Sequence, residues 1–171
     1  GMVGSAIKRA FENEGGVEII TRSHSELDLM DQRTVSEFIQ EQQPNLVILA
    51  AAMVGGIKAN MSYPAEFLFN NLSIQNNVID SSYKAKVEKF IFLGSSCIYP
   101  KNSPQPMTED LLLTGELEPT NEGYALAKIA GLKLIEFYKK QYNFNGISLM
   151  PCNLYGTNDS FDPEHSHVLS A

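Results

Sequence analysis

The stretch Leu46-Val-Ile-Leu-Ala-Ala-Ala52 decides the fold, because all seven of its residues are apolar. A strand with one face in water alternates apolar and polar side chains, whereas unbroken apolarity is typical of a parallel strand covered on both faces. The later stretch Lys89-Phe-Ile-Phe-Leu-Gly94 has the same character. The two stretches therefore predict strands of a buried parallel sheet.

Helical and strand-like patterns alternate along the rest of the chain. Apolar residues at helical spacing predict helices at residues 2–14, 34–42, 64–84 and 122–141. Further strands are predicted at residues 17–22 and 147–151, and residues 100–121 form the longest irregular segment. This order predicts one α/β domain with a doubly wound parallel sheet, whose ligand lies outside the carboxyl ends of the strands.

The composition argues against several classes of protein. The chain has 171 residues and a net charge of −7, and its 13 basic residues are scattered, which argues against a nucleic-acid partner. No apolar run approaches the roughly 20 residues that span a bilayer, so we expect no membrane contact. Cys97 and Cys152 form neither a disulfide framework nor a zinc-ligand pair, which favours a reducing cytoplasm and no bound metal.

The first helix begins with Gly1-x-x-Gly4, a spacing that lets a phosphate approach a helix N-terminus. About 20 residues later, an acid would favour NAD, whereas an arginine accommodates the additional phosphate of NADP. Arg22 and His24 occupy that place, and the next acid is Glu26. NADP(H) is therefore favoured over NAD, and an ordinary solvated charge is the alternative interpretation of Arg22.

A second pattern, Tyr124-x-x-x-Lys128, places a phenol and an ammonium group on one face of a helix. A phenol with a pKa of about 10 is a poor acid-base group at neutral pH, and a nearby ammonium favours its ionised form. We therefore expect Lys128 to lower the pKa of Tyr124. The spacing is common by chance, and it gains weight from Gly94-Ser-Ser96, which lies at a predicted strand end about 30 residues earlier.

Cys97 directly follows Gly94-Ser-Ser96 and has four possible roles: core residue, redox centre, metal ligand or catalytic group. The absence of a cysteine pair with zinc-ligand spacing argues against a metal site. Free cysteine is often simply buried, so packing in the core stays open beside catalysis.

Together, Gly1-x-x-Gly4, Leu49-Ala-Ala-Ala52, Gly94-Ser-Ser96 and Tyr124-x-x-x-Lys128 resemble the extended short-chain dehydrogenase/reductases. The resemblance covers essentially the whole chain, and Gly94-Ser-Ser-Cys-Ile-Tyr-Pro100 is specific within that family. It implies a Rossmann-like NAD(P)-binding domain. For members with this segment, it implies NADPH-dependent 3,5-epimerisation and 4-reduction of the nucleotide sugar GDP-4-keto-6-deoxy-D-mannose.

The resemblance also implies roles for individual residues. Ser95 would hydrogen-bond the C4 carbonyl, Tyr124 would donate a proton to it, and Lys128 would orient Tyr124 and the cofactor ribose. Cys97 and His167 would be the acid-base pair for epimerisation, although a structural role for His167 stays open because His165 lies close by. The cofactor is expected to contact Gly1, Met2, Val3, Gly4, Arg22, His24, Asp28, Leu29, Ala50, Ala51, Leu93, Gly94, Ser95, Ser96, Tyr124, Lys128, Pro151, Asn153, Leu154 and His167.

The resemblance further implies that residues 1–171 are a partial domain, cut at both ends, without the first strand and the C-terminal substrate domain. We expect this piece alone to fold poorly and to be inactive. The helices at 64–84 and 122–141 carry apolar residues around much of their circumference. The resemblance implies that such helices join two copies, so we expect a homodimer of the intact protein; deep burial against the sheet and the missing domain is the alternative. Two rivals remain: another nucleotide-sugar epimerase, reductase or dehydratase of the same family, and a regulatory protein that binds NADP without catalysis.

Overall fold

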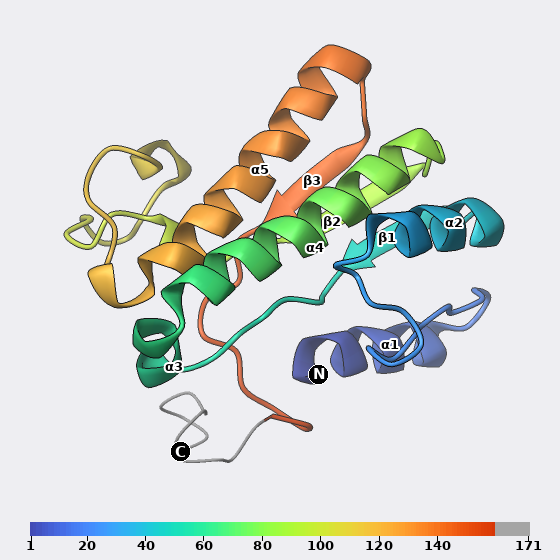
Figure 1. The fold of residues 1–171 in the computed structure, drawn as a ribbon, viewed down its shortest axis with the longest axis horizontal. Coiled ribbons are helices and arrows are strands. Elements are labelled where there is room, and N and C mark those ends of the chain that lie inside the picture. Colours follow the sequence, from blue (N-terminus) through green and yellow to red (C-terminus); the bar gives the residue numbers. More distant parts are fainter. Residues whose placement is uncertain (160–171) are drawn as a thin grey trace.

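The computed structural model describes residues 1–159, which form an α/β structure with a three-stranded parallel sheet (Figure 1). Strands β1 (Leu46–Leu49), β2 (Lys89–Leu93) and β3 (Gly146–Leu149) lie in the order β1-β2-β3. Ile91 of β2 is in register with Ile48 of β1 and Ile147 of β3. The predicted parallel sheet is confirmed, with strands that end two or three residues earlier at β1 and β3.

Helices α4 (Pro64–Lys84) and α5 (Glu122–Tyr142) pack side by side over one face of this sheet (Figure 1). Helix α2 (Gln32–Gln42) packs along α4, and it begins earlier than predicted because the Asp31 side chain accepts hydrogen bonds from the first-turn N–H groups. Phe90 and Phe92 of β2 are completely buried beneath the helices. The short helix α3 (Ile57–Ser62), which precedes α4, was not predicted.

The predicted strand at residues 17–22 is wrong. Helix α1 (Met2–Glu14) ends at Gly15, whose φ of 72° suits glycine, and residues 17–22 continue as irregular chain with Val17 54% exposed. A strand needs a neighbour to accept and donate its backbone hydrogen bonds. In the described sheet, β1 pairs only with β2, and residues 17–22 join no ladder despite their β-branched sequence.

A close approach of helix and sheet fixes the position of α5. A Cβ atom added at Gly131 would lie 2.6 Å from Cζ of Phe92 and 2.8 Å from Oε1 of Gln75 on α4. The Gln75 side chain donates a 2.6 Å hydrogen bond to the backbone oxygen of Ala127. Both contacts hold α5 close to β2 and α4, so the N-terminal turns of α5 lie at the carboxyl end of β2.

The segment after β2 is irregular, as predicted, and contains three short 3-10 turns. They are η1 (Ser96–Ile98), η2 (Glu109–Leu111) and η3 (Pro119–Asn121), the last of which leads directly into α5. Within residues 1–159, no helix has both the length and the apolar character needed to cross a membrane.

Candidate functional site

The candidate site lies where β2 ends and α5 begins. The Lys128 side chain is 5% exposed and donates a 2.9 Å hydrogen bond from Nζ to the backbone oxygen of Leu93, the last residue of β2. Nζ also lies 4.9 Å from the ring centre of Phe92 and 5.6 Å from that of Tyr124. Residues 35 positions apart in the chain are therefore joined at the floor of the site.

Ser95, Cys97 and Tyr124 form a cluster above this floor. The Ser95 hydroxyl oxygen accepts a 3.3 Å hydrogen bond from the backbone N–H of Cys97, which orients η1. The Ser95 side chain and Cys97 both lie near enough to the Tyr124 phenol to influence its pKa. Cys97 is half-buried.

The phenol of Tyr124 is held in its neutral form. Burial raises its pKa to about 12, the nearby Cys97 acts in the same direction, and the Ser95 side chain opposes them more weakly. The expectation that Lys128 lowers this pKa is therefore wrong, because the loss of solvent outweighs an ammonium group that is directed at the Leu93 carbonyl. A neutral phenol is a proton donor, which is the form that reduction of a carbonyl requires.

Asn121 belongs to the cluster, and sequence reasoning missed it. It is the last residue of η3, and its Nδ2 donates a hydrogen bond to the Cys97 sulfur over 3.3 Å. The only signal in the sequence was a polar residue at the start of a predicted helix, which ordinarily indicates a helix cap.

A second asparagine positions the chain after β1. Asn71 on α4 is 2% exposed, and its side-chain amide accepts a hydrogen bond from the backbone N–H of Met53 and donates one to the Met53 oxygen. This pairing fixes the segment that contains Ala50 and Ala51, two of the predicted cofactor contacts.

The start of α1 suits a phosphate group. Gly1 is the N-cap, and no side chain caps the helix in the described structure. A Cβ atom at Gly1 would meet nothing within 4 Å, and one at Gly4 would lie 3.7 Å from Cβ of Ala50. The first turn of α1 thus lies close to the chain that follows β1, and a helix N-terminus beside a strand end suits the phosphates of a dinucleotide cofactor.

The remaining predicted cofactor contacts lie on segments around the same strand ends or beyond α1. Arg22 and His24 are exposed; the Arg22 guanidinium lies 5.0 Å from the ring centre of Phe38, and His24 lies 4.0 Å from the Asp28 carboxylate. The Leu29 oxygen accepts a hydrogen bond from Asn77 of α4. Gly94 and Ser96 follow β2, and Pro151, Asn153 and Leu154 follow β3. His167 lies outside the described residues.

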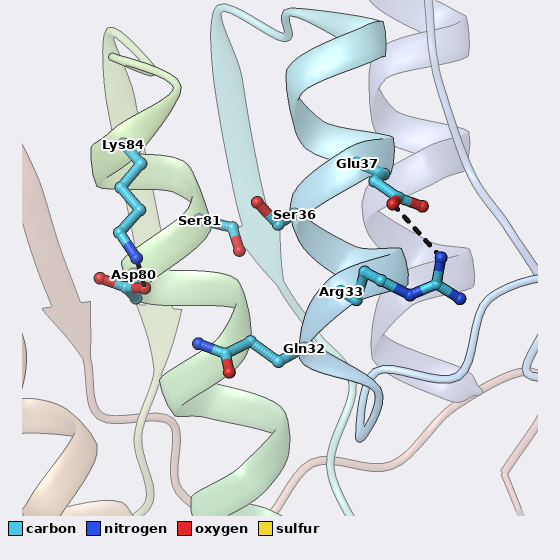
Figure 2. Close-up of a pocket in the computed structure, with 7 residues that line it drawn as sticks. All are labelled: Gln32, Arg33, Ser36, Glu37, Asp80, Ser81 and Lys84. Carbon is cyan, nitrogen blue, oxygen red and sulfur yellow. Dashed lines mark hydrogen bonds and ion pairs between the residues drawn. The ribbon is translucent and has the colours of Figure 1, made fainter.

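A groove of about 350 Å³ between α2 and α4 is separate from this cluster (Figure 2). Its charged side chains are paired, with Arg33 3.5 Å from Glu37 and Lys84 2.7 Å from Asp80. It lies at the C-terminal end of α4, whereas the start of α5 packs against the N-terminal end of α4 at Pro64. We interpret it as part of the polar surface.

A parallel α/β sheet with Ser95 after β2 and with Tyr124 and Lys128 on α5 is the arrangement that the resemblance to the short-chain dehydrogenase/reductases implied. Residues 1–171 match the NAD dependent epimerase/dehydratase family, and the chain belongs to this family. It is 56% identical over 171 residues to GDP-L-fucose synthase 1 of Arabidopsis thaliana and 53% identical over 171 residues to GDP-L-fucose synthase of Escherichia coli. Both alignments cover the whole chain and 53% of the relative, so the chain spans about half the length of these relatives.

A solved structure supports the same fold. The structure of a GDP-D-glycero-L-gluco-heptose synthase from Campylobacter jejuni, determined in the presence of NADPH, superposes with a TM-score of 0.94 at 38% identity. The superposition covers 99% of this chain and 50% of that one.

Burial of Lys128 predicts a specific pH dependence of stability. Burial lowers the pKa of Lys128 to about 8, against an ordinary value of 10.5 in the unfolded chain. Between these values the unfolded chain binds the proton and the folded protein does not, so stability rises with pH across this window. In the intact protein, the free energy of unfolding relative to a Lys128→Met variant should rise by on the order of 2 kcal/mol from pH 8 to pH 10. Urea unfolding at several pH values measures it, and a flat difference would contradict the burial of a titrating Lys128.

Proposed function

We propose that the intact protein converts GDP-4-keto-6-deoxy-D-mannose to GDP-L-fucose by epimerisation at C3 and C5 and reduction at C4, with NADPH as the cofactor. The observation that carries the proposal is the cluster of Ser95, Cys97 and Tyr124 above the buried Lys128. The identity of 53% to 56% with GDP-L-fucose synthases supports the choice of substrate.

Reduction uses the phenol and the hydroxyl of the cluster. NADPH supplies the hydride that C4 accepts. The Ser95 hydroxyl binds the C4 carbonyl oxygen, and the neutral Tyr124 phenol donates its proton to that oxygen as the hydroxyl group forms. Lys128 holds Tyr124 and the cofactor ribose in position.

Epimerisation uses the thiol. The C4 ketone acidifies the C–H bonds at C3 and C5, so a base on one face and an acid on the other invert each centre. Cys97 follows β2 two residues after Ser95 and influences the pKa of Tyr124, which supports its assignment to carbons next to the carbonyl that Tyr124 protonates. We assign the opposite role to His167.

NADP(H) is proposed over NAD. The exposed Arg22 follows α1 at the place where an arginine accommodates the additional phosphate of NADP. The related heptose synthase, whose structure was determined in the presence of NADPH, supports this choice. The proposed contacts are the residues named above at the start of α1, at the strand ends and on α5. A cytoplasmic location is proposed with this soluble substrate and cofactor.

The rival within the family is an enzyme for another nucleotide sugar, such as the heptose derivative that the Campylobacter relative is named for. The two functions differ in their substrate and in the need for proton exchange at C3 and C5. Supplying GDP-4-keto-6-deoxy-D-mannose and NADPH in deuterated water tests both points at once. Loss of NADPH absorbance together with deuterium at C3 and C5 supports the proposal, and no reaction with this substrate rejects it.

The intact protein is proposed to be a homodimer that joins through α4 and α5. Phe69 of α4 is 64% exposed and Phe137 of α5 is 60% exposed, although both lie on the helices that also cover the sheet. A charge at such a contact opposes association. Phe137→Glu should therefore reduce the mass measured by light scattering to that of a monomer, while Lys86→Glu, after the end of α4, should leave it unchanged. A Phe137→Glu protein that stays dimeric would place the interface elsewhere.

Removing the thiol should separate the two reactions. Cys97→Ser is expected to reduce deuterium exchange at C3 and C5 by at least about a hundredfold, because a hydroxyl is a far weaker acid-base group than a thiol. Binding of NADPH, followed by its fluorescence, should not change. Cys152→Ser removes the other, exposed cysteine and should leave exchange intact. Undiminished exchange in Cys97→Ser would reject the role of Cys97.

Removing the phenol oxygen should have the opposite effect. Tyr124→Phe is expected to slow NADPH oxidation by about a hundredfold to ten-thousandfold, since the proton donor to the C4 oxygen is lost. Exchange at C3 and C5 should continue. Tyr142→Phe, at the far end of α5, is the matched control and should leave both rates unchanged. Loss of both reactions in Tyr124→Phe would indicate a shared acid.

A further inference from the structure

Asn121 lies at the position that caps α5, but its side chain does not act as a cap. It immediately precedes Glu122, the first residue of the helix, and its side chain makes no capping hydrogen bond. An asparagine at this position ordinarily accepts a hydrogen bond from a first-turn N–H group with its side-chain oxygen, which stabilises the helix. The Asn121 side chain therefore does not stabilise α5 in this way.

The Asn121 amide is directed at Cys97 instead. Its Nδ2 lies 3.3 Å from the Cys97 sulfur, and its Oδ1 is buried without a hydrogen-bond partner. A buried carbonyl oxygen without a donor is unfavourable, and native proteins rarely retain one. In this orientation the Asn121 side chain does not cap α5, and its Oδ1 has no hydrogen-bond donor. Both are unfavourable, and what the orientation provides is an N–H group directed at the Cys97 sulfur.

We propose that Asn121 is a positioning residue for epimerisation, which fixes the Cys97 sulfur and favours its thiolate form. The inference rests on the proposed function of Cys97. An N–H donor stabilises the negative sulfur, and the thiolate is the form that accepts a proton. The sulfur takes the proton from C3 or C5, and the electrons of the C–H bond move to the C4 oxygen to give an enolate. Return of a proton from the opposite face moves those electrons back to carbon.

Other groups near the sulfur do not supply this stabilisation. The Ser95 oxygen accepts from the backbone N–H of Cys97, and the Tyr124 phenol is neutral. The Lys128 ammonium is hydrogen-bonded to the Leu93 oxygen. Near η3, the Glu118 carboxylate is paired with Lys101 at 3.0 Å. Asn121 is thus the donor that the described structure directs at the sulfur.

Alkylation of Cys97 tests the proposal without reference to the sugar. The rate of reaction with iodoacetamide at neutral pH is measured in the intact protein by mass spectrometry of the Cys97 peptide. Asn121→Ala opens space beside the sulfur, so a purely packing role predicts faster alkylation. The proposal predicts alkylation about tenfold slower, because the thiolate fraction falls. Asn121→Asp keeps the size, removes the donor and adds a negative charge, and should be slower still.

Asn77→Ala is the matched control. Its amide donates to the Leu29 and Met30 oxygens, away from the sulfur, and the variant should react at the unmodified rate. Alkylation that is unchanged or faster in both Asn121 variants would overturn the proposal.

Turnover gives the second readout. In Asn121→Ala, exchange at C3 and C5 should fall about tenfold, while hydride transfer to a substrate that is already epimerised should not change. Equal loss of both rates would indicate a merely structural residue and would count against the proposal. An unmodified protein without any exchange, but with slower alkylation in the variants, would leave the Asn121–Cys97 hydrogen bond standing and overturn the proposed function instead.

Discussion

The structure depends on the close contact between α5 and β2 at Gly131. Because glycine has no Cβ, the helix approaches Phe92 to a distance that any other residue would obstruct. Helix α5 carries Tyr124 and Lys128, and Asn121 immediately precedes it. This one contact therefore determines how far three polar side chains lie from the end of β2. A larger residue at position 131 would displace the helix and all three groups with it.

Burial is the physical cause of the shifted pKa values of Tyr124 and Lys128. The same loss of solvent raises the pKa of the Tyr124 phenol to about 12 and lowers that of the Lys128 ammonium to about 8. Both shifts favour the neutral side chain. The cluster therefore combines a protonated phenol with a thiol that accepts a hydrogen bond from a neutral amide.

The sequence predicted the elements whose signals are local. The continuous apolar strands at 46–52 and 89–94 and the helix at 64–84 were recognisable from periodicity and from Pro64 at the helix start. Residues 17–22 have the composition of a strand. A strand forms only where a second segment pairs with it, and the sequence of residues 17–22 does not determine whether such a segment lies beside it. Asn121 was missed for a similar reason, since its target lies 24 residues earlier in the chain. The protonation of Tyr124 was predicted in the wrong direction, because the depth of burial is not visible in a spacing of four residues.

The two hydrogen bonds that join Lys128 to Leu93 and Asn121 to Cys97 close the base of the long segment between η1 and α5. Chain inserted into a loop whose ends are already held adds little to the entropy of closing it. Residues 100–118 could therefore lengthen, shorten or change in sequence during evolution while the reacting groups stay in register. Variation in this loop would leave the relative positions of Cys97 and Lys128 unchanged, because both are held at the end of β2 by contacts outside it.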